Sequence, residues 1–204
     1  MRRVGIIDYG LCNIDSIARA VDINGGRATI SCDPDVVRKQ DLLLLPGVGA
    51  FDAAMEKLVA FGLADAIKEE VGRGTPLLGI CLGMQLLARR SEEGTSCDGL
   101  GLIDGEVVRL ERTNQQERIP HIGWNELIVL KDDPLLKGAF PADFYFVHSY
   151  HMRCRDEGDI VATTPFCGAF TSIVRHGIVA GTQFHPEKSW PAGHKLLANF
   201  IGTA

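Results

Sequence analysis

Cys81 stands where the chain could present a reactive sulfur. The segment Gly79–Gly83 reads G-I-C-L-G and directly follows the apolar run Leu77–Ile80. A cysteine on a sharp strand-to-helix turn between small residues is typical of a nucleophile elbow in which cysteine replaces serine. The partial positive charge at the start of the following helix favours the thiolate, the reactive form. Because G-x-C-x-G is a loose pattern, a buried structural cysteine remains an alternative on this motif alone.

His185 and Glu187 supply the groups that would activate such a sulfur. They follow the strand-like run Ile178–Phe184, and residues i and i+2 of an extended chain point to the same face. A cysteine, a histidine and a carboxylate form the nucleophile, base and orienting group of covalent acyl transfer. A surface His-Pro-Glu turn is the alternative. The other histidines lack a carboxylate two residues later: His121, His148, His151, His176 and His194.

The segment Pro46–Phe51 could hold the oxyanion that such an attack creates. It reads P-G-V-G-A-F and links an apolar run to a helical pattern, and its glycines let backbone N–H groups turn toward a ligand. Leu82, directly after the nucleophile, is the first expected donor, and Val48 or Gly49 is the second. A dinucleotide phosphate loop is the rival, but Asp52 stands where G-x-G-x-x-G requires glycine. A simple tight turn is the remaining alternative.

The elements that must position these groups alternate between strand and helix in the first half of the chain. We expect strands at Val4–Asp8, Ala28–Cys32, Leu42–Leu45 and Leu77–Ile80. Helical patterns lie between and after them, with Asn13 as an N-cap, and cover roughly 14–21, 51–58, 63–71 and Met84–Arg90. Short apolar strands alternating with helices predict a parallel sheet covered on both faces.

The second half is rich in strands, with few helices before a closing helix that places Leu196, Leu197 and Phe200 on one face. His176-Gly177 is expected to form a hairpin turn. The pattern predicts one three-layer α/β domain over residues 1–204, with a mostly parallel central sheet and an antiparallel extension. The expected strands are Glu106–Leu110, Leu127–Leu130, Phe144–Val147, Ile160–Thr164, Thr171–Val174 and Ile178–Phe184.

Composition narrows the possible functions. The chain has 204 residues, 46% of them hydrophobic, and a net charge of −5, which is unlike the basic footprint of a nucleic-acid binder. Signal-peptide and membrane-spanning patterns are not found, so we expect a cytoplasmic protein. Among six cysteines there is no C-x-x-C pair, so we expect no metal and no cofactor. The five cysteines other than Cys81 are expected to be small buried hydrophobic residues.

Two motifs carry a family resemblance. The segments Gly79–Gln85 (G-I-C-L-G-M-Q) and Gln183–Lys188 (Q-F-H-P-E-K) resemble those of class I glutamine amidotransferases. Met84 and the segment Pro120–Asn125 (P-H-I-G-W-N) resemble, more narrowly, the glutaminase subunits of imidazole glycerol phosphate synthases. Further matching segments are P-G-V-G, S-E-E-G and Y-F-V-H-S-Y, so the resemblance covers essentially the whole chain. Cys12 departs from the small residue expected near the N-terminus.

The resemblance implies a flavodoxin-like amidotransferase domain that hydrolyses glutamine to glutamate and ammonia. It places the catalytic triad on Cys81, His185 and Glu187. For Glu93, a solvated Glu92-Glu93 pair is the alternative. The implied glutamine contacts come from Gly49, Gln85, Glu93, Ser149 and Tyr150.

The resemblance also implies a partner, a (β/α)8-barrel cyclase subunit that forms a heterodimer with this chain and receives its ammonia in histidine biosynthesis. The interface candidates are Trp124, Asn125, Tyr145 and Lys188, although Trp124 could instead anchor the core. An amidotransferase subunit for anthranilate, carbamoyl phosphate or pyridoxal phosphate synthesis is the nearest alternative. A thiol hydrolase of the α/β-hydrolase kind would normally place its acid before the histidine, whereas Glu187 follows His185.

Overall fold

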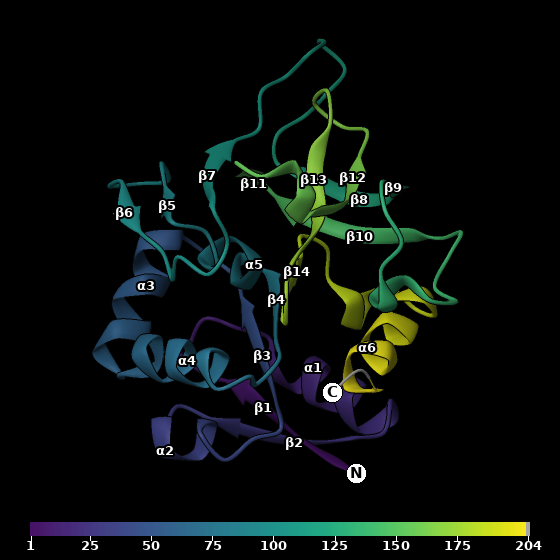
Figure 1. Cartoon of the computed structure of the whole chain (residues 1–204). Coiled ribbons are helices and arrows are strands. Elements are labelled where there is room, and N and C mark those ends of the chain that lie inside the picture. The colour runs from purple at the N-terminus through teal and green to yellow at the C-terminus, as the bar shows by residue number, and fades with distance from the viewer. Residues whose placement is uncertain (203–204) are drawn as a thin grey trace.

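A central sheet organises the computed structural model, which describes residues 1–202 (Figure 1). Its strands within these residues are β1 (Arg2–Ile7), β2 (Gly26–Ser31), β3 (Leu42–Gly47), β4 (Leu77–Cys81), β9 (Ile128–Val129), β12 (Ile160–Thr164), β13 (Phe170–His176) and β14 (Val179–Thr182). They lie in the order β2-β1-β3-β4-β14-β13-β12-β9. From β2 to β14 each strand is parallel to its neighbour, and β13, β12 and β9 then add antiparallel pairs. This confirms the predicted α/β architecture with an antiparallel extension.

Helices cover both faces of this sheet. They are α1 (Ile14–Ile23), α2 (Pro34–Val37), α3 (Phe51–Ala60), α4 (Leu63–Gly72), α5 (Leu82–Leu86) and α6 (Ala192–Gly202). The four leucines of β3 show how one strand serves both layers, because successive side chains point to opposite faces. Leu42 and Leu44 pack in the core that contains residues of α1 and α6, whereas Leu43 and Leu45 pack with residues of α3, α4 and α5.

Two smaller sheets sit above the carboxyl ends of the parallel strands (Figure 1). One is a ribbon of β8 (His121–Glu126) and β10 (Asp143–His148), and the other has the order β11-β7-β5-β6. The strands of this second sheet are β5 (Arg90–Ser91), β6 (Cys97–Asp98), β7 (Gly105–Arg109) and β11 (Tyr150–Cys154), and the 3₁₀ turns are η1 (Pro134–Leu136), η2 (Glu157–Asp159) and η3 (Pro186–Lys188).

Several local predictions were wrong. The predicted helix Met84–Arg90 ends at Leu86, because the chain turns there and Arg90 pairs in β5. The predicted strand Leu127–Leu130 shortens to the two residues of β9. Strands β5, β6, β8 and β11 lacked a predicted counterpart.

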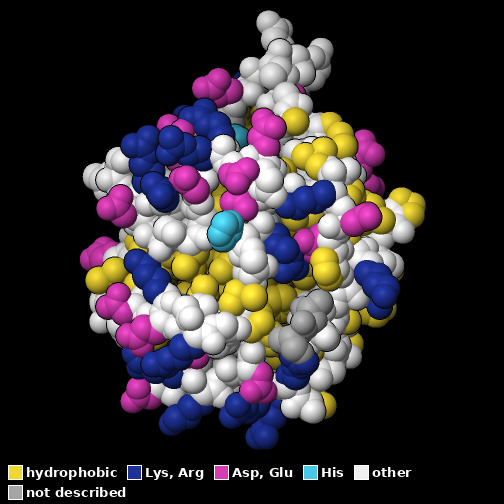
Figure 2. All heavy atoms as spheres, viewed as in Figure 1, with side chains coloured by type: hydrophobic (Ala, Val, Ile, Leu, Met, Phe, Trp, Pro, Cys, Tyr) yellow, Lys and Arg dark blue, Asp and Glu magenta, His cyan; other side chains and the backbone are white. Residues whose placement is uncertain are grey.

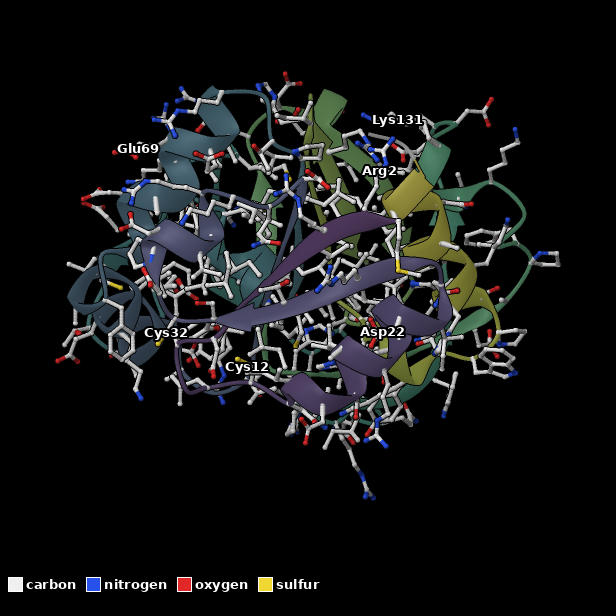
Figure 3. All side chains as sticks on the ribbon, turned by 90° about the horizontal axis from the view of Figure 1, so that it is seen from below. Arg2, Cys12, Asp22, Cys32, Glu69 and Lys131 are labelled. Carbon is white, nitrogen blue, oxygen red and sulfur yellow. The ribbon has the colours of Figure 1, made fainter. Side chains whose placement is uncertain are left out.

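The cysteines other than Cys81 are less buried than expected. Cys32 is exposed, and Cys12, Cys97, Cys154 and Cys167 are partly exposed. Cys12 and Cys32 lie beyond the carboxyl ends of neighbouring strands β1 and β2, where the chain leaves the sheet (Figure 3). No helix within residues 1–202 is both long and apolar enough to cross a bilayer.

Gly83 permits the tightest packing in the fold, so its replacement tests this packing. A Cβ atom at position 83 would collide with the backbone carbonyl oxygen of Leu45. We expect Gly83→Ala to lower the free energy of unfolding by about 3 kcal/mol, measured by denaturant titration, because backbone atoms must move. Gly72→Ala is the matched control, since a Cβ there meets nothing within 4 Å. Equal stabilities of the two variants would contradict the packing argument.

Candidate active site

Cys81 sits at the junction of β4 and α5 in a strained backbone conformation. Its φ of 56° and ψ of −112° lie in a region that L-residues rarely adopt. A Cβ atom at position 79 would lie 2.6 Å from the carbonyl oxygen of Gly83, so glycine is required beside the turn. The side chain is almost fully buried, with 5% of the residue exposed. The geometry is that of the predicted nucleophile elbow.

His185 and Glu187 form a buried hydrogen-bonded pair near this turn. His185 Nδ1 lies 2.9 Å from Glu187 Oε1, and their side chains are 5% and 1% exposed. Strand β14 brings them there, because it pairs in parallel with β4 and matches Thr182 to Ile80. The backbone N–H of His185 also donates to the carbonyl of Tyr145 at 3.0 Å. The histidine is therefore held through both its ring and its backbone.

The electrostatics of His185 favour its charged form. Burial alone would lower the pKa of His185, but Cys81 and Glu187 outweigh it and raise the pKa to about 10. With Nδ1 bound to Glu187, the other ring nitrogen, Nε2, is buried and has no hydrogen-bond partner within residues 1–202. A buried imidazole that is oriented by a carboxylate through Nδ1 and lies near a cysteine through its other nitrogen has the arrangement that covalent acyl transfer requires.

A cavity of about 280 Å³ opens at Cys81. It is a small, partly open cavity whose lining is mostly apolar, with a few polar groups that could orient a small substrate. It brings together the residues predicted for the oxyanion and for glutamine. The predicted residues that line it with Cys81 are Val48, Gly49, Leu82, Gln85, Glu93, Ser149 and Tyr150.

In the predicted oxyanion loop, Pro46–Phe51, one of the expected N–H donors does not point into this cavity. The backbone N–H of Val48 donates to the carbonyl of Leu11 at 2.9 Å, so that donor is engaged within the protein. Gly49 has a φ of +104°, and a Cβ there would meet nothing within 4 Å. The peptide between Gly47 and Val48, which carries this N–H, can therefore turn only after the Val48–Leu11 hydrogen bond breaks.

Glu93 is not a freely solvated charge, which was the alternative for this residue. Its Oε2 accepts a hydrogen bond from the backbone N–H of Phe51 at 3.0 Å, at the start of α3. Burial raises the pKa of Glu93, the Phe51 hydrogen bond opposes this, and the charge of Asp52 adds to it. The carboxylate is half-buried at the cavity wall, where it can meet a substrate cation.

Two residues at the site had no predicted role. Gln183 Nε2 lies 3.8 Å from the sulfur of Cys81, and His148 lines the cavity. The signal for Gln183 was its position two residues before His185 in an extended run. The signal for His148 was its alternation with Phe144 and Phe146, which places all three side chains on the buried face of β10.

The interface candidates divide between the two faces of the β8–β10 ribbon. Trp124 is 55% exposed on the outer face, so the alternative of a core anchor is wrong. Its ring lies 5.8 Å from that of Tyr145, and Lys188 Nζ lies 5.6 Å from the same tyrosine ring. Asn125 instead points to the inner face and lies 3.5 Å from His121 Nε2.

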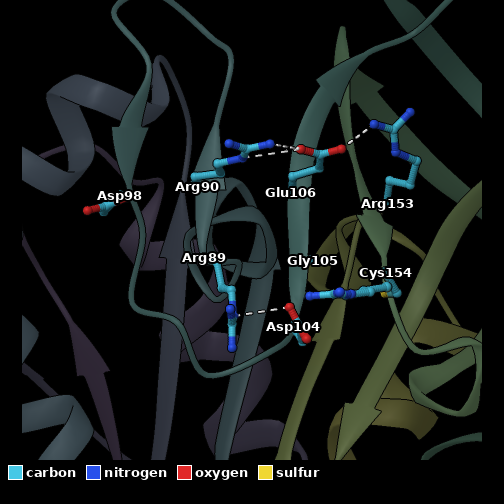
Figure 4. Close-up of a pocket in the computed structure, with 9 residues that line it drawn as sticks. Arg89, Arg90, Asp98, Asp104, Gly105, Glu106, Arg153 and Cys154 are labelled. Carbon is cyan, nitrogen blue, oxygen red and sulfur yellow. Dashed lines mark hydrogen bonds and ion pairs between the residues drawn. The ribbon is translucent and has the colours of Figure 1, made fainter.

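A second hollow, of about 590 Å³, lies beside β5, β7 and β11 and is lined by charged residues (Figure 4). Arg90 and Arg153 both bind the carboxylate of Glu106, and Arg89 Nε lies 3.0 Å from Asp104 Oδ1. Basic side chains gather over the same region in Figure 2. Because the charges of neighbouring strands alternate and pair, this is a surface ion-pair ladder that joins the strands of the small sheet.

Comparisons with known proteins show the family of this chain and its fold. The family model "Glutamine amidotransferase class-I" matches residues 6–203. The chain is 46% identical to imidazole glycerol phosphate synthase subunit HisH 1 of Campylobacter jejuni, over 97% of this chain and 98% of that protein. It is 44% identical to subunit HisH of Geobacillus kaustophilus, over 98% and 97%. The fold is similar to a solved structure of PurLQS from Thermotoga maritima, with a TM-score of 0.76, 22% identity and 99% coverage of both chains.

The influence of Cys81 on His185 can be measured directly. We expect Cys81→Ala to lower the pKa of His185 below its wild-type value of about 10, because the sulfur is the largest influence that raises it. The measurement is an NMR titration of the imidazole. Since the folded pKa is raised above the ordinary 6.5, charged His185 stabilises the fold fully below about pH 6.5, and this contribution is lost as pH rises through 10. An unchanged pKa in Cys81→Ala would rule out the coupling.

Proposed function

The chain belongs to the class I glutamine amidotransferases, and on that premise we propose that it is the glutaminase subunit of imidazole glycerol phosphate synthase. It hydrolyses glutamine to glutamate and ammonia, and the ammonia serves histidine biosynthesis. The observation that carries the chemistry is the buried His185–Glu187 pair beside the strained Cys81. Sequence identity of 42–46% over nearly the full length of named HisH subunits supports the assignment of the pathway.

The reaction proceeds by covalent catalysis. The Cys81 thiolate attacks the carboxamide carbon of glutamine, and the resulting oxyanion is held by the N–H of Leu82 and by the loop at Val48 and Gly49. His185, oriented by Glu187, donates a proton to the nitrogen, and ammonia leaves a glutamyl thioester on the sulfur. His185 then accepts a proton from water, which attacks the thioester and releases glutamate.

Substrate orientation follows from the groups that line the cavity. Glu93 would pair with the ammonium group of glutamine, and Gln85 and the Ser149-Tyr150 segment, which line the same cavity, would make further substrate contacts. These contacts point the carboxamide toward Cys81, with Gly49 near its oxygen. The roles are proposals, supported by the position of each residue at one cavity.

The partner is proposed to be a (β/α)8-barrel cyclase subunit in a heterodimer with this chain, which acts as one domain over residues 1–204 in the cytoplasm. The outer face of the β8–β10 ribbon suits docking, because Trp124 and Ile122 are large, apolar and exposed. Lys188 adjoins Glu187 in sequence, so a subunit bound there would lie next to the triad. Ammonia must cross in a water-poor passage, since in bulk water it is protonated and loses its nucleophilicity.

Partner control of the reaction has a physical basis in the oxyanion loop. Because the Val48 N–H is bound to Leu11, the isolated subunit holds one oxyanion donor away from the substrate. A subunit that favours the turned peptide would raise kcat. The loss of one oxyanion donor costs roughly 100- to 1,000-fold in kcat, so the isolated subunit should be slow.

The assay that tests the function measures glutamate release by the wild type and by Cys81→Ala. Each is assayed alone and with the cyclase subunit loaded with its ribonucleotide ligand. We expect low turnover alone, an increase of at least about 100-fold with the loaded partner, and none for Cys81→Ala. If the wild type hydrolyses glutamine but is not accelerated by the partner, the triad mechanism stands and the assignment to histidine biosynthesis fails. Glutamate release by Cys81→Ala would contradict the proposed mechanism.

A pair of glycine substitutions tests the loop. Gly49 and Gly74 have similar strained φ values, +104° and +99°, and a Cβ at either would meet nothing within 4 Å. We expect Gly49→Ala and Gly74→Ala each to lose about 1 kcal/mol of stability, but only Gly49→Ala to lower kcat, by about tenfold or more. Thermal unfolding and glutaminase kinetics measure the two effects. Equal kcat values would contradict a role for the Gly49 backbone in catalysis.

A further inference from the structure

The backbone carbonyl of Tyr150 accepts hydrogen bonds from two buried side chains on opposite sides. His148 Nδ1 lies 2.9 Å from it, and Gln85 Nε2 lies 2.8 Å from it. A carbonyl oxygen can only accept, so both nitrogens must carry hydrogen. This one oxygen therefore fixes the donor and acceptor roles along two chains of contacts.

The outward chain leads from Tyr150 to strand β8. Because His148 donates from Nδ1, its neutral ring accepts at Nε2, which lies 3.1 Å from His121 Nδ1. His121 must then donate from Nδ1 and accept at Nε2, which faces Asn125 Nδ2 at 3.5 Å. The Asn125 oxygen is already taken by the N–H of Glu126 at 2.9 Å, so the amide cannot flip freely. Both histidines are thus held as Nδ1–H tautomers.

The inward chain leads from Tyr150 to the nucleophile. Gln85 Nε2 also donates to Gln183 Oε1 at 3.0 Å, which leaves the Nε2 of Gln183 directed to the sulfur of Cys81 at 3.8 Å. If the Gln183 amide were flipped, its oxygen would face the sulfur instead and would repel a thiolate. The orientation that delivers an N–H to Cys81 therefore follows from the acceptor at Tyr150.

The surroundings keep the two histidines neutral. His121 and His148 are 5% and 7% exposed, and the rings of Phe146, Phe166 and Phe170 pack around them. Burial lowers the pKa of His121 to about 4 and that of His148 to about 3. A neutral pair in an aromatic setting can hold fixed tautomers at any pH at which the enzyme would act.

We propose that His148, backed by His121, is a positioning residue for glutamine hydrolysis: it fixes the Tyr150 carbonyl so that Gln85 and Gln183 present an N–H to the sulfur of Cys81. The outer end of the same chain is Asn125, on the strand that carries Trp124 on its other face. The consequence for glutamine turnover rests on the proposed function, whereas the arrangement at the sulfur does not.

The tautomers can be observed in the wild-type protein. Side-chain ¹⁵N spectra of histidine-labelled protein should show His121 and His148 both as neutral Nδ1–H tautomers, with assignments from His121→Gln and His148→Phe. An Nε2–H tautomer at His148 would break the chain at its first step and overturn the proposal. Because this measurement reads the unaltered protein, it stands even if a variant folds poorly.

The reactivity of Cys81 gives a second readout. Iodoacetamide is small and neutral and needs no glutamine contacts, and alkylation of the peptide that carries Cys81 can be followed by mass spectrometry. We expect His148→Phe, which keeps an aromatic ring, to slow this alkylation by about tenfold, the effect of one hydrogen bond to a charged group. The exposed Cys32 is an internal reference whose rate should not change.

His151→Phe is the matched control. His151 is a neighbouring histidine near Phe170, but its Nδ1 has no hydrogen-bond partner in the part of the molecule that the structure describes, and it takes no part in the chain of contacts. We expect this variant to alkylate at the wild-type rate. A slowing equal to that of His148→Phe would assign the effect to aromatic packing and overturn the proposal.

A double-mutant cycle shows whether His148 acts through Gln183. We expect Gln183→Met to slow the alkylation of Cys81, and His148→Phe to add nothing further in that background. Additive effects would mean that His148 reaches the sulfur by another route, and the proposal would fail. If the cycle behaves as expected but the wild type releases no glutamate under any condition, the positioning stands and the proposed function fails.

Discussion

The approach of Gly83 to the carbonyl of Leu45 is the constraint on which the site depends. It presses the first turn of α5 against β3, and the chain can turn there only if Cys81 takes a positive φ. The sulfur is then set above the sheet, and the ladder between β4 and β14 brings the other triad residues to it. Backbone packing, rather than any side-chain contact, thus locates the sulfur of Cys81.

The parallel half of the sheet could be predicted from sequence because its signals are local. The glycines two residues on either side of Cys81 report a close backbone approach. The expectation that an extended strand sets His185 beside Glu187 was wrong in its reason, because β14 ends at Thr182 and Glu187 lies in the 3₁₀ turn Pro186–Lys188; the catalytic roles of the two residues stay a prediction. The leucines of β3 report burial on both faces. The resemblance to a known family then supplied the substrate and the partner, which local physics could not have given.

The parts that sequence did not predict depend on contacts between distant segments. Strand β8 alternates His121 and Asn125 with exposed Ile122 and Trp124, and its pairing with β10 becomes visible only in three dimensions. The engagement of the Val48 N–H by Leu11 joins two loops. Histidine tautomers likewise follow from a carbonyl that belongs to another strand, so residue type alone cannot give them.

The hairpin between β13 and β14 turns in two residues, Gly177 and Ile178, and so sets how far β14 extends along β4. Side chains alternate along a strand, so a slip of one residue would turn the side chains of β14 to the other face of the sheet and displace the segment with His185 and Glu187 that follows it. In evolutionary terms, the exposed loop at 112–118 is free to change its length, whereas this small turn is not, although it lies far from the chemistry. Insertions and deletions should therefore be tolerated in the exposed loop and not at this hairpin.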